Sequence, residues 1–292
     1  MDSLNFSVKR GTIHGFLGPN GAGKSTTLRM IAGLLSATEG KVLINGIEQL
    51  PEKNELKNKI GLLPEHAPLY PELSVKEYLS FVLKLHNKFK ASELDRLIDE
   101  LQLSEVSNRL IGHLSRGYRQ RVGLAQAMIY DPEIIIMDEP TTGLDPHSVV
   151  EWREWIKKLA PKKTIIFSSH VLSEVELLCD DITVIHHGKI RATGKLSDIQ
   201  KKFNHGQKVK IEIENQKHIQ DSIKSLPFVS EIIQSHFDHK NIHLEVLLRG
   251  DNDMRPELIS WLVSQKIGVY GVEKADYHLE EIFMKLTTED AQ

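Results

Sequence analysis

The stretch Gly18-Pro19-Asn20-Gly21-Ala22-Gly23-Lys24-Ser25 fits the pattern G-x-x-x-x-G-K-[ST] of a phosphate-binding loop. Its glycines let the backbone turn sharply and point successive N–H groups inward, where Cβ atoms would obstruct a phosphate. Lys24 supplies a charge for the β- and γ-phosphates, and Ser25 supplies a hydroxyl for Mg²⁺. We expect a nucleoside triphosphate to bind here, with Thr26 in the helix that follows the loop.

The sequence around this loop supplies the context that the motif requires. An apolar run at residues 13–17 precedes the loop and predicts a strand, and apolar residues at helical spacing follow from about Gly23. A helix that starts there directs its positive N-terminal end at the same phosphates. An ordinary glycine-rich turn between a strand and a helix is the alternative, and this context disfavours it.

Composition narrows the class of protein. The 292 residues can hold one large domain plus a small one, or two medium ones, and the 37 basic and 40 acidic residues give a net charge of −3. This near balance argues against binding nucleic acid through bulk charge. Cys179 is the only cysteine, so no intrachain disulfide forms and a cytosolic setting is favoured. No apolar run approaches the roughly 18 residues of a membrane-spanning helix, so any action on a membrane would need a partner.

Short apolar runs indicate a mostly parallel sheet in the first part of the chain. Alternating Leu4, Phe6 and Val8 predict a strand over residues 3–8. Continuous apolar runs predict strands that are covered on both faces, and residues 182–185 with 189–193 predict a closing hairpin. The runs lie at residues 60–63, 134–137 and 164–167.

A helical segment of about residues 70–131 interrupts these strands. Apolar residues recur there at helical spacing, and Ser74 with Glu77 forms the sequence signature of a capping box. Alternation of strands and helices predicts an α/β domain over residues 1–204, with this helical subdomain inside it. The linker is expected at His205-Gly206.

Residues 207–292 follow a different pattern, with strands and helices in the order βαββαβ. This order predicts a small α+β accessory domain of the ferredoxin-like type. It contains no glycine-rich phosphate loop and no cysteine, so we expect no chemistry of its own there. Whether it stabilises a dimer or acts as a regulatory sensor stays open at this point.

Two further motifs could complete a nucleotide site. Asp138 and Glu139 follow the apolar run at residues 134–137, so a parallel strand would place Asp138 near Mg²⁺ and Glu139 near the water that attacks the γ-phosphate. The alternative is a solvated turn. Leu114-Ser115-Arg116-Gly117-Tyr118 opens a helix with Ser115 as its N-cap, and spacing alone favours a plain capped helix.

Taken together, these motifs resemble the ATP-binding subunit of ABC transporters over residues 3 to about 200. The resemblance assigns Walker A to residues 18–25, the signature to 114–118, Walker B to 134–139, the D-loop to Gly143-Leu144-Asp145 and the switch histidine to His170. It implies a P-loop NTPase fold of the ABC ATPase type with ATP and Mg²⁺ as ligands. The resemblance also implies that two subunits meet head to tail and hold each ATP between Walker A of one and the signature of the other.

The resemblance further implies a role for each matching residue. Ser115 and Gly117 would contact the γ-phosphate of the partner's ATP, and Asp145 would tie the two sites together. His170, with Lys24, would contact the γ-phosphate from the same subunit. With Glu139, these two form the expected catalytic set, and the expected metal ligands are Ser25, Asp138 and Glu65.

The chain departs from the family pattern at three places. Arg116 and Tyr118 replace the first glycine and the glutamine of Leu-Ser-Gly-Gly-Gln, whereas the serine and the second glycine are kept, and Glu65 stands where the Q-loop glutamine is usual. A carboxylate is still a competent ligand for a hard cation. The family's aromatic residue that stacks on adenine comes before the position of Ser3, so we expect it upstream of this start, or else a weaker hold on adenine.

The motifs and the appended domain most resemble ATPases of ABC-2-type exporters of the gliding-motility, copper-enzyme-maturation and drug-resistance kind. We therefore expect an ATPase that forms a homodimer and powers a separate multi-span membrane permease, and that is cytoplasmic and peripheral on the inner face of the membrane. The alternatives are a soluble ABC-superfamily ATPase without a transporter partner and a non-hydrolysing nucleotide-sensing scaffold. Nucleic acid is not an expected partner.

Overall fold

A computed structural model describes residues 1–52, 56–85, 91–203, 206–238, 240–250, 253–275 and 279–288. The chain divides into two compact units, Met1–Leu196 and Ser197–Gln292. This division precedes the linker expected at residues 205–206 by one helix, α7 (Leu196–Phe203). His205 of that expected linker lies outside the described residues.

The first unit is built on a six-stranded sheet in the order β4-β5-β6-β1-β7-β8. All neighbours are parallel except β7 and β8, which form the predicted closing hairpin. Central strands are buried along their whole length because helices cover both faces, as their continuous apolar runs predict. The strands are β1 (Ile13–Leu17), β4 (Ile60–Leu63), β5 (Ile134–Met137), β6 (Thr164–Ser169), β7 (Asp181–His186) and β8 (Lys189–Lys195).

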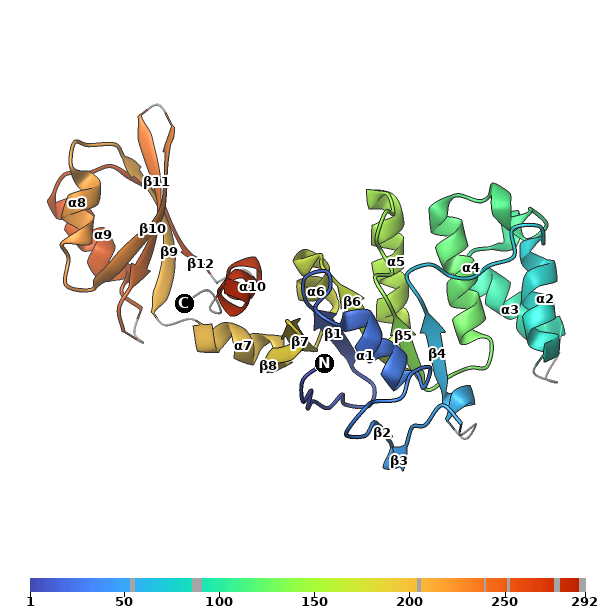
Figure 1. The fold of residues 1–292 in the computed structure, drawn as a ribbon. Coiled ribbons are helices and arrows are strands. Elements are labelled where there is room, and N and C mark those ends of the chain that lie inside the picture. Colours follow the sequence, from blue (N-terminus) through green and yellow to red (C-terminus); the bar gives the residue numbers. More distant parts are fainter. Residues whose placement is uncertain are drawn as a thin grey trace. The chain divides into compact units, whose positions relative to one another are not determined.

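Helices follow the carboxyl ends of three central strands and so place three loops at one edge of the sheet (Figure 1). Helix α1 (Lys24–Ile31) follows β1, α5 (Pro146–Leu159) follows β5, and α6 (Leu172–Leu178) follows β6. In parallel α/β sheets, ligands bind outside this edge. The topology thus brings the three loops with candidate residues to one place.

The segment expected to form a helical subdomain contains α2 (Val75–Leu85), α3 (Ala91–Glu100) and α4 (Arg116–Met128), which gather beyond strand β4 (Figure 1). Two short 3₁₀ turns, Ser104–Val106 and Ile111–His113, join α3 to α4. The capping box is confirmed, because the Ser74 backbone N–H donates to Glu77 Oε2 at 2.9 Å and the Glu77 N–H donates to Ser74 Oγ at 3.3 Å.

A small hairpin and a 3₁₀ turn connect α1 to β4. Strands β2 (Leu43–Ile44) and β3 (Ile47–Glu48) are joined by Asn45 and Gly46, both with positive φ. Positive φ at both central residues is what a tight hairpin turn requires, and asparagine and glycine adopt it most readily. The 3₁₀ turn is Lys57–Lys59.

The prediction of a strand at residues 3–8 is wrong, because this segment pairs with no strand within the described residues. The alternation still sets the face correctly: Leu4 and Phe6 pack against a cluster that contains Phe16, and Val8 packs against a cluster that contains Leu28. Alternation therefore determines which side chains turn inward. It does not provide the neighbouring backbone that a sheet ladder requires.

The second unit is a four-stranded antiparallel sheet in the order β10-β11-β9-β12, with the element order βαββαβ that the sequence predicts. Helices α8 and α9 pack on one face of this sheet through the apolar core. On the other face, α10 is held by an ion pair of 2.7 Å between Lys208 Nζ and Glu281 Oε1. The elements are β9 (Gln207–Glu214), α8 (Ile219–Lys224), β10 (Val229–Asp238), β11 (Asn241–Leu248), α9 (Arg255–Ser264), β12 (Val269–Ala275) and α10 (Leu279–Thr288).

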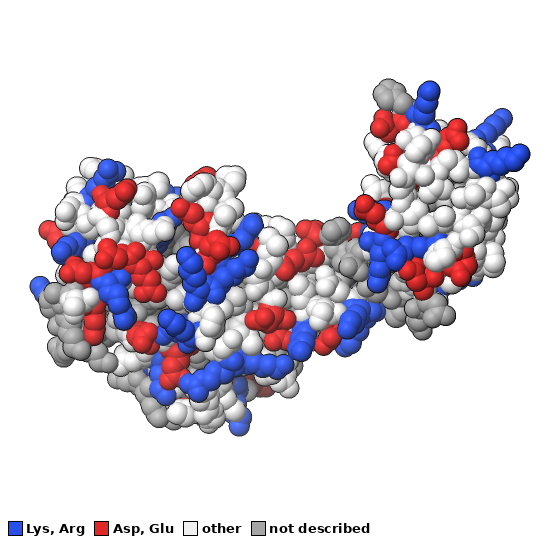
Figure 2. All heavy atoms as spheres, turned by 180° about the vertical axis from the view of Figure 1, so that it is seen from behind, with Lys and Arg blue, Asp and Glu red and all other residues white. Residues whose placement is uncertain are grey.

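The surface carries charges of both signs. Figure 2 shows basic and acidic side chains interspersed over the visible face of each unit, as the near-balanced composition suggests. Over the part of the chain that the structure describes, no helix has the length and apolar character to cross a membrane.

Candidate functional site

The phosphate loop connects β1 to α1 and has the backbone geometry that its glycines permit. Gly21 and Gly23 have φ of +79° and +107°, a region that side chains disfavour. A Cβ on Gly18 would lie 2.4 Å from the carbonyl oxygen of Ile185, so the loop also packs closely on β7. Ala22 points away from the loop's ligand side and is buried in a cluster with Phe16.

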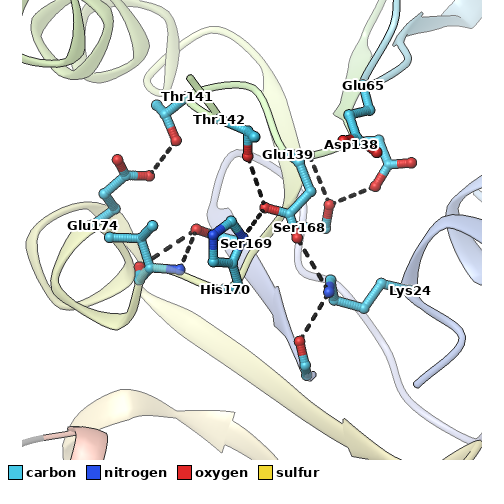
Figure 3. Close-up of polar contacts among 12 residues, drawn as sticks. Lys24, Glu65, Asp138, Glu139, Thr141, Thr142, Ser168, Ser169, His170 and Glu174 are labelled. Atoms are coloured by element: carbon cyan, nitrogen blue, oxygen red, sulfur yellow. Dashed lines mark hydrogen bonds and ion pairs between the residues drawn. The ribbon is translucent and has the colours of Figure 1, made fainter. Parts of the chain in front are cut away.

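Lys24 is held in place by its own loop. Its Nζ donates to the carbonyl oxygens of Gly18 at 2.8 Å and Pro19 at 3.4 Å, and the side chain is only 6% exposed. A third contact joins Nζ to Glu139 Oε1 at 3.1 Å (Figure 3). The ammonium group is thus fixed at the mouth of the loop before any phosphate arrives.

A cleft of about 380 Å³ lies beside the loop and collects most of the predicted residues. The lining comes from the phosphate loop, from the loop after β4, and from the turns after β5 and β6. The lining residues are Pro19, Asn20, Gly21, Gly23, Lys24, Ser25, Thr26, Glu65, Glu139, Thr142 and His170. Three stretches that are far apart in the sequence therefore meet the loop, as the parallel sheet predicts.

Glu139 is the centre of the polar contacts in this cleft. Its Oε2 accepts from His170 Nδ1 at 2.7 Å and from the Thr142 hydroxyl at 3.3 Å, while Oε1 faces Lys24 (Figure 3). Its φ is +49°, a conformation that is uncommon for a residue other than glycine and that occurs often at functional sites. The surrounding bonds are what hold this residue in that conformation.

Several opposing effects set the pKa of Glu139. Burial alone would raise it, but the hydrogen bond from His170 and the charge of Lys24 stabilise the carboxylate and together outweigh burial. The net pKa of Glu139 lies below the ordinary glutamate value. In this arrangement the group is ionised at neutral pH.

The oxygen donors predicted for Mg²⁺ suit a hard cation. Asp138 is buried, and one of its oxygens, Oδ1, accepts from the Ser168 hydroxyl at 2.7 Å, which orients the carboxylate. Ser25 and Glu65 both line the cleft. Mg²⁺ commonly binds through one or two carboxylates together with substrate phosphates, and it keeps several waters. The residues present therefore fit Mg²⁺; within the described residues, no group of three or more His, Cys, Asp or Glu forms a metal cluster of protein ligands alone.

Ser115, Gly117 and Asp145 do not line this cleft; they lie at the N-termini of α4 and α5. Ser115 is the predicted N-cap, and its Oγ accepts from the Tyr118 N–H at 3.4 Å. Asp145 caps α5 by accepting from the Ser148 N–H at 3.0 Å, and hydrogen bonds from Ser148 hold the pKa of Asp145 below its ordinary value. None of these three residues is among those that line the cleft.

Sequence reasoning missed the residues that connect the turns after β5 and β6. Ser168 donates to Asp138 and accepts from the Glu139 N–H at 2.9 Å, so it orients both acidic residues. Thr142 contacts Glu139 directly. The only available signal was position: Ser168 lies at the carboxyl end of a buried strand, two residues before His170.

A glycine-rich loop between a strand and a helix, with a buried lysine facing an acidic pair at the end of a parallel strand, defines a P-loop nucleoside triphosphatase. Comparisons with known proteins narrow this class. Residues 1–142 match the family model described as ABC transporter. The chain belongs to the ATP-binding proteins of ABC transporters, a family of ATPases, because relatives in that family match along nearly its whole length.

Three similar proteins illustrate the match. The bacitracin transport ATP-binding protein BcrA of Bacillus licheniformis is 34% identical, covering 98% of this chain and 92% of that protein. The linearmycin resistance ATP-binding protein LnrL of Bacillus subtilis (strain 168) is 30% identical, with 97% and 92% covered. A solved ATP-binding subunit of an ABC transporter is 32% identical with a TM-score of 0.61, covering 68% of this chain and 84% of that one.

A solved dimeric bacterial ABC transporter cassette is also similar. It is 29% identical with a TM-score of 0.59, and the match covers 66% of this chain and 89% of that chain. The structural matches therefore extend over about two thirds of this chain, whereas the sequence matches to BcrA and LnrL extend over nearly all of it.

Proposed function

We propose that this chain hydrolyses ATP as one of two identical subunits and thereby powers a separate membrane permease that exports its substrate. The observation that carries the proposal is the contact chain Lys24–Glu139–His170 beside the phosphate loop. It places a cation for phosphate, a carboxylate and an imidazole on one wall of one cleft. Phosphoryl transfer is catalysed mainly by positioning and by charge, and these groups supply both.

In the proposed mechanism, Glu139 is the general base. Lys24 binds the β- and γ-phosphates, and the γ-phosphate then competes with Glu139 for the lysine charge. Because Lys24 contributes to the lowered pKa of Glu139, withdrawal of that charge makes the carboxylate a stronger base. Glu139 then accepts the proton of the water that attacks the γ-phosphorus, the bond from that phosphorus to the bridging oxygen of the β-phosphate breaks, and ADP and phosphate leave; His170 holds the carboxylate from its other oxygen.

Mg²⁺ would be held by Ser25 and Asp138, with Glu65 reaching it from the loop after β4. When bound, it neutralises charge on the phosphate oxygens. Ser168 maintains the orientation of Asp138 through its 2.7 Å bond, so the ligand geometry is set by the protein before the ion binds. The phosphate loop residues and Thr26 contribute the surrounding contacts to ATP.

The signature residues act in the second subunit's site. Ser115 and Gly117 lie at the N-terminus of α4, and Asp145 lies at the N-terminus of α5. Such N-termini attract anions. Head-to-tail pairing would bring them to the partner's γ-phosphate and close a composite site. The similar dimeric cassette supports this pairing.

The export direction and the membrane partner rest on the relatives. One of them is described by transport of bacitracin and another by resistance to linearmycin. The subunit would lie on the cytoplasmic face of the membrane through its permease, with the helical subdomain of about residues 70–131 as the docking region. The accessory domain, residues 207–292, would contribute no catalytic group.

The decisive experiment replaces Glu139 with Gln, which keeps the size of the side chain and removes the base. Hydrolysis should fall about 100-fold or more, since general bases contribute on that order. ATP binding should persist. Light scattering should therefore show a dimer that forms when ATP is added and persists because ATP is not hydrolysed. Glu133→Gln is the matched control, because this carboxylate lies at the opposite end of the same strand.

Turnover of Glu139→Gln close to that of Glu133→Gln would overturn the general-base assignment. Loss of hydrolysis without any ATP-dependent dimer would be consistent with Glu139 as the general base but would contradict the composite site. ATP binding without hydrolysis in the unaltered protein would favour a nucleotide-sensing scaffold instead of an ATPase.

A further inference from the structure

A buried hydrogen bond outside the catalytic contacts joins the same two turns. Thr141 Oγ1 donates to Glu174 Oε2 at 2.6 Å, and the two residues are 7% and 4% exposed (Figure 3). Thr141 lies two residues after Glu139, and Glu174 lies four residues after His170. The mechanism proposed above uses neither residue.

The presence of a buried carboxylate at this position requires an explanation. Burying a charge costs free energy unless hydrogen bonds and neighbouring charges compensate, and an apolar residue of similar size could fill the same space at lower cost. A carboxylate that accepts a short bond in a buried setting gains strength and direction from the low local dielectric. Glu174 is therefore better suited to fixing a geometry than to filling a space.

The geometry that needs fixing is the contact between Glu139 and His170. His170 is half exposed, so packing alone does not fix its imidazole against the carboxylate. Its position follows from the backbone of the turn after β6, just as that of Glu139 follows from the turn after β5. Ser168 joins the two turns at the strand ends, and Glu174 joins them on the side of the helices.

We propose that Glu174 is a positioning residue for ATP hydrolysis, which acts through Thr141 to hold the Glu139 turn in register with the His170 turn. This inference rests on the proposed function, because it assumes that Glu139 and His170 act together on the attacking water. Thr141 also lies four residues before Asp145, in the same connection from β5 to α5. The bond thus links the cleft to the segment that would meet the second subunit.

The test compares three threonine variants by steady-state hydrolysis and by binding of a fluorescent ATP analogue. Thr141→Val removes the hydroxyl at constant shape and should lower kcat about 10-fold or more, because small misplacements of catalytic groups are costly. Affinity for the analogue and KM should stay within about twofold, since no direct contact to the nucleotide is lost. Thr141→Ser keeps the hydroxyl and should restore most of kcat.

Thr183→Val is the matched control. Thr183 is fully buried in the same unit and bonds His14 Nε2 at 2.9 Å and Thr193 Oγ1 at 2.8 Å, away from the residues that line the cleft. It should lower the melting temperature as much as Thr141→Val does and leave kcat unchanged. Equal kcat in the two valine variants would overturn the inference.

A second variant covers the case in which Thr141→Val does not fold. Glu174→Asp keeps the charge and shortens the side chain by one methylene, so it should fold and lower kcat several-fold with unchanged KM. Wild-type kcat in Glu174→Asp would also overturn the inference. Failure of the unaltered protein to hydrolyse ATP would instead overturn the proposed function, so the two failures are distinguishable.

Discussion

Two regions of the first unit carry predicted nucleotide contacts, and they differ in how their polar groups are used. In the turn after β5, Glu139 is 9% exposed and bonded to groups from the phosphate loop and from the turn after β6. At the start of α4, Ser115 is exposed, and the hydrogen-bond partner of its hydroxyl among the described residues is the N–H of Tyr118 in the same helix. Asp145, at the start of α5, is likewise bonded within its own turn.

The difference distinguishes a site that is preorganised from one that needs a second component. Groups fixed by several bonds in a water-poor cleft need little rearrangement when charge develops on a substrate. The capped start of a helix is not surrounded by such fixed polar groups. It acquires them only when another protein surface covers it. Under the proposed function, the same sequence would thus encode one half-site that is complete within the chain and one half-site that is only a complementary surface.

The largest expected effect tests the preorganised half. Lys24→Ala removes a charge-assisted contact to phosphate, so calorimetry should show ATP affinity reduced about 10- to 100-fold, as expected for a hydrogen bond to a charged group. Lys41→Ala, at an exposed lysine between the phosphate loop and β4, is the control and should bind ATP normally. Unchanged ATP affinity in Lys24→Ala would mean that the region around Glu139 is not a preorganised ATP site and does not differ in this respect from the start of α4.

A smaller effect tests the second half. Ser115→Ala, made in the Glu139→Gln protein, should weaken the ATP-dependent dimer about 10-fold, which corresponds to the loss of a single phosphate contact. ATP affinity of the single subunit should not change, because Ser115 does not line its own cleft.

The control for Ser115→Ala is Ser74→Ala, which also removes a serine at a helix start, here the capping box of α2. Both substitutions should destabilise the fold by about 1 kcal/mol, the typical cost of losing a cap. Only Ser115→Ala should affect the dimer. A dimer weakened equally by both would assign Ser115 to helix stability alone.

Much of the fold could be predicted from local sequence signals. The spacing from Ser74 to Glu77 predicts a bond that the structure contains, because both partners lie in one helical turn. The continuous apolar runs predict the parallel strands for a similar reason, since a strand buried on both faces requires an apolar residue at each successive position. The prediction of a strand at residues 3–8 was wrong because strand pairing depends on a neighbouring strand, which no local sequence pattern specifies.

The candidate site likewise contains some residues that local sequence signals predict and others that depend on contacts between distant parts of the chain. Lys24 and Glu139 are predictable because phosphate chemistry fixes their residue types and their places in motifs. Ser168 and Glu174 were not predictable, because they act on residues about 30 positions away in the chain, and the contact exists only after the sheet has formed. Their residue types, serine and glutamate, are common on any surface.

The smallest expected effect concerns pH and tests whether the preorganised half also stabilises the fold. The pKa of Glu139 is lowered in the folded protein, so its stabilising contribution is present above the ordinary glutamate pKa and is lost as pH falls below it. As the pH falls from 7 through the ordinary glutamate pKa and on through the lowered pKa of Glu139, the melting temperature of the wild type should therefore fall by more than that of Glu139→Gln. Scanning fluorimetry measures this difference, and parallel curves for the two proteins would mean that the contacts of Glu139 order the cleft without stabilising the unit.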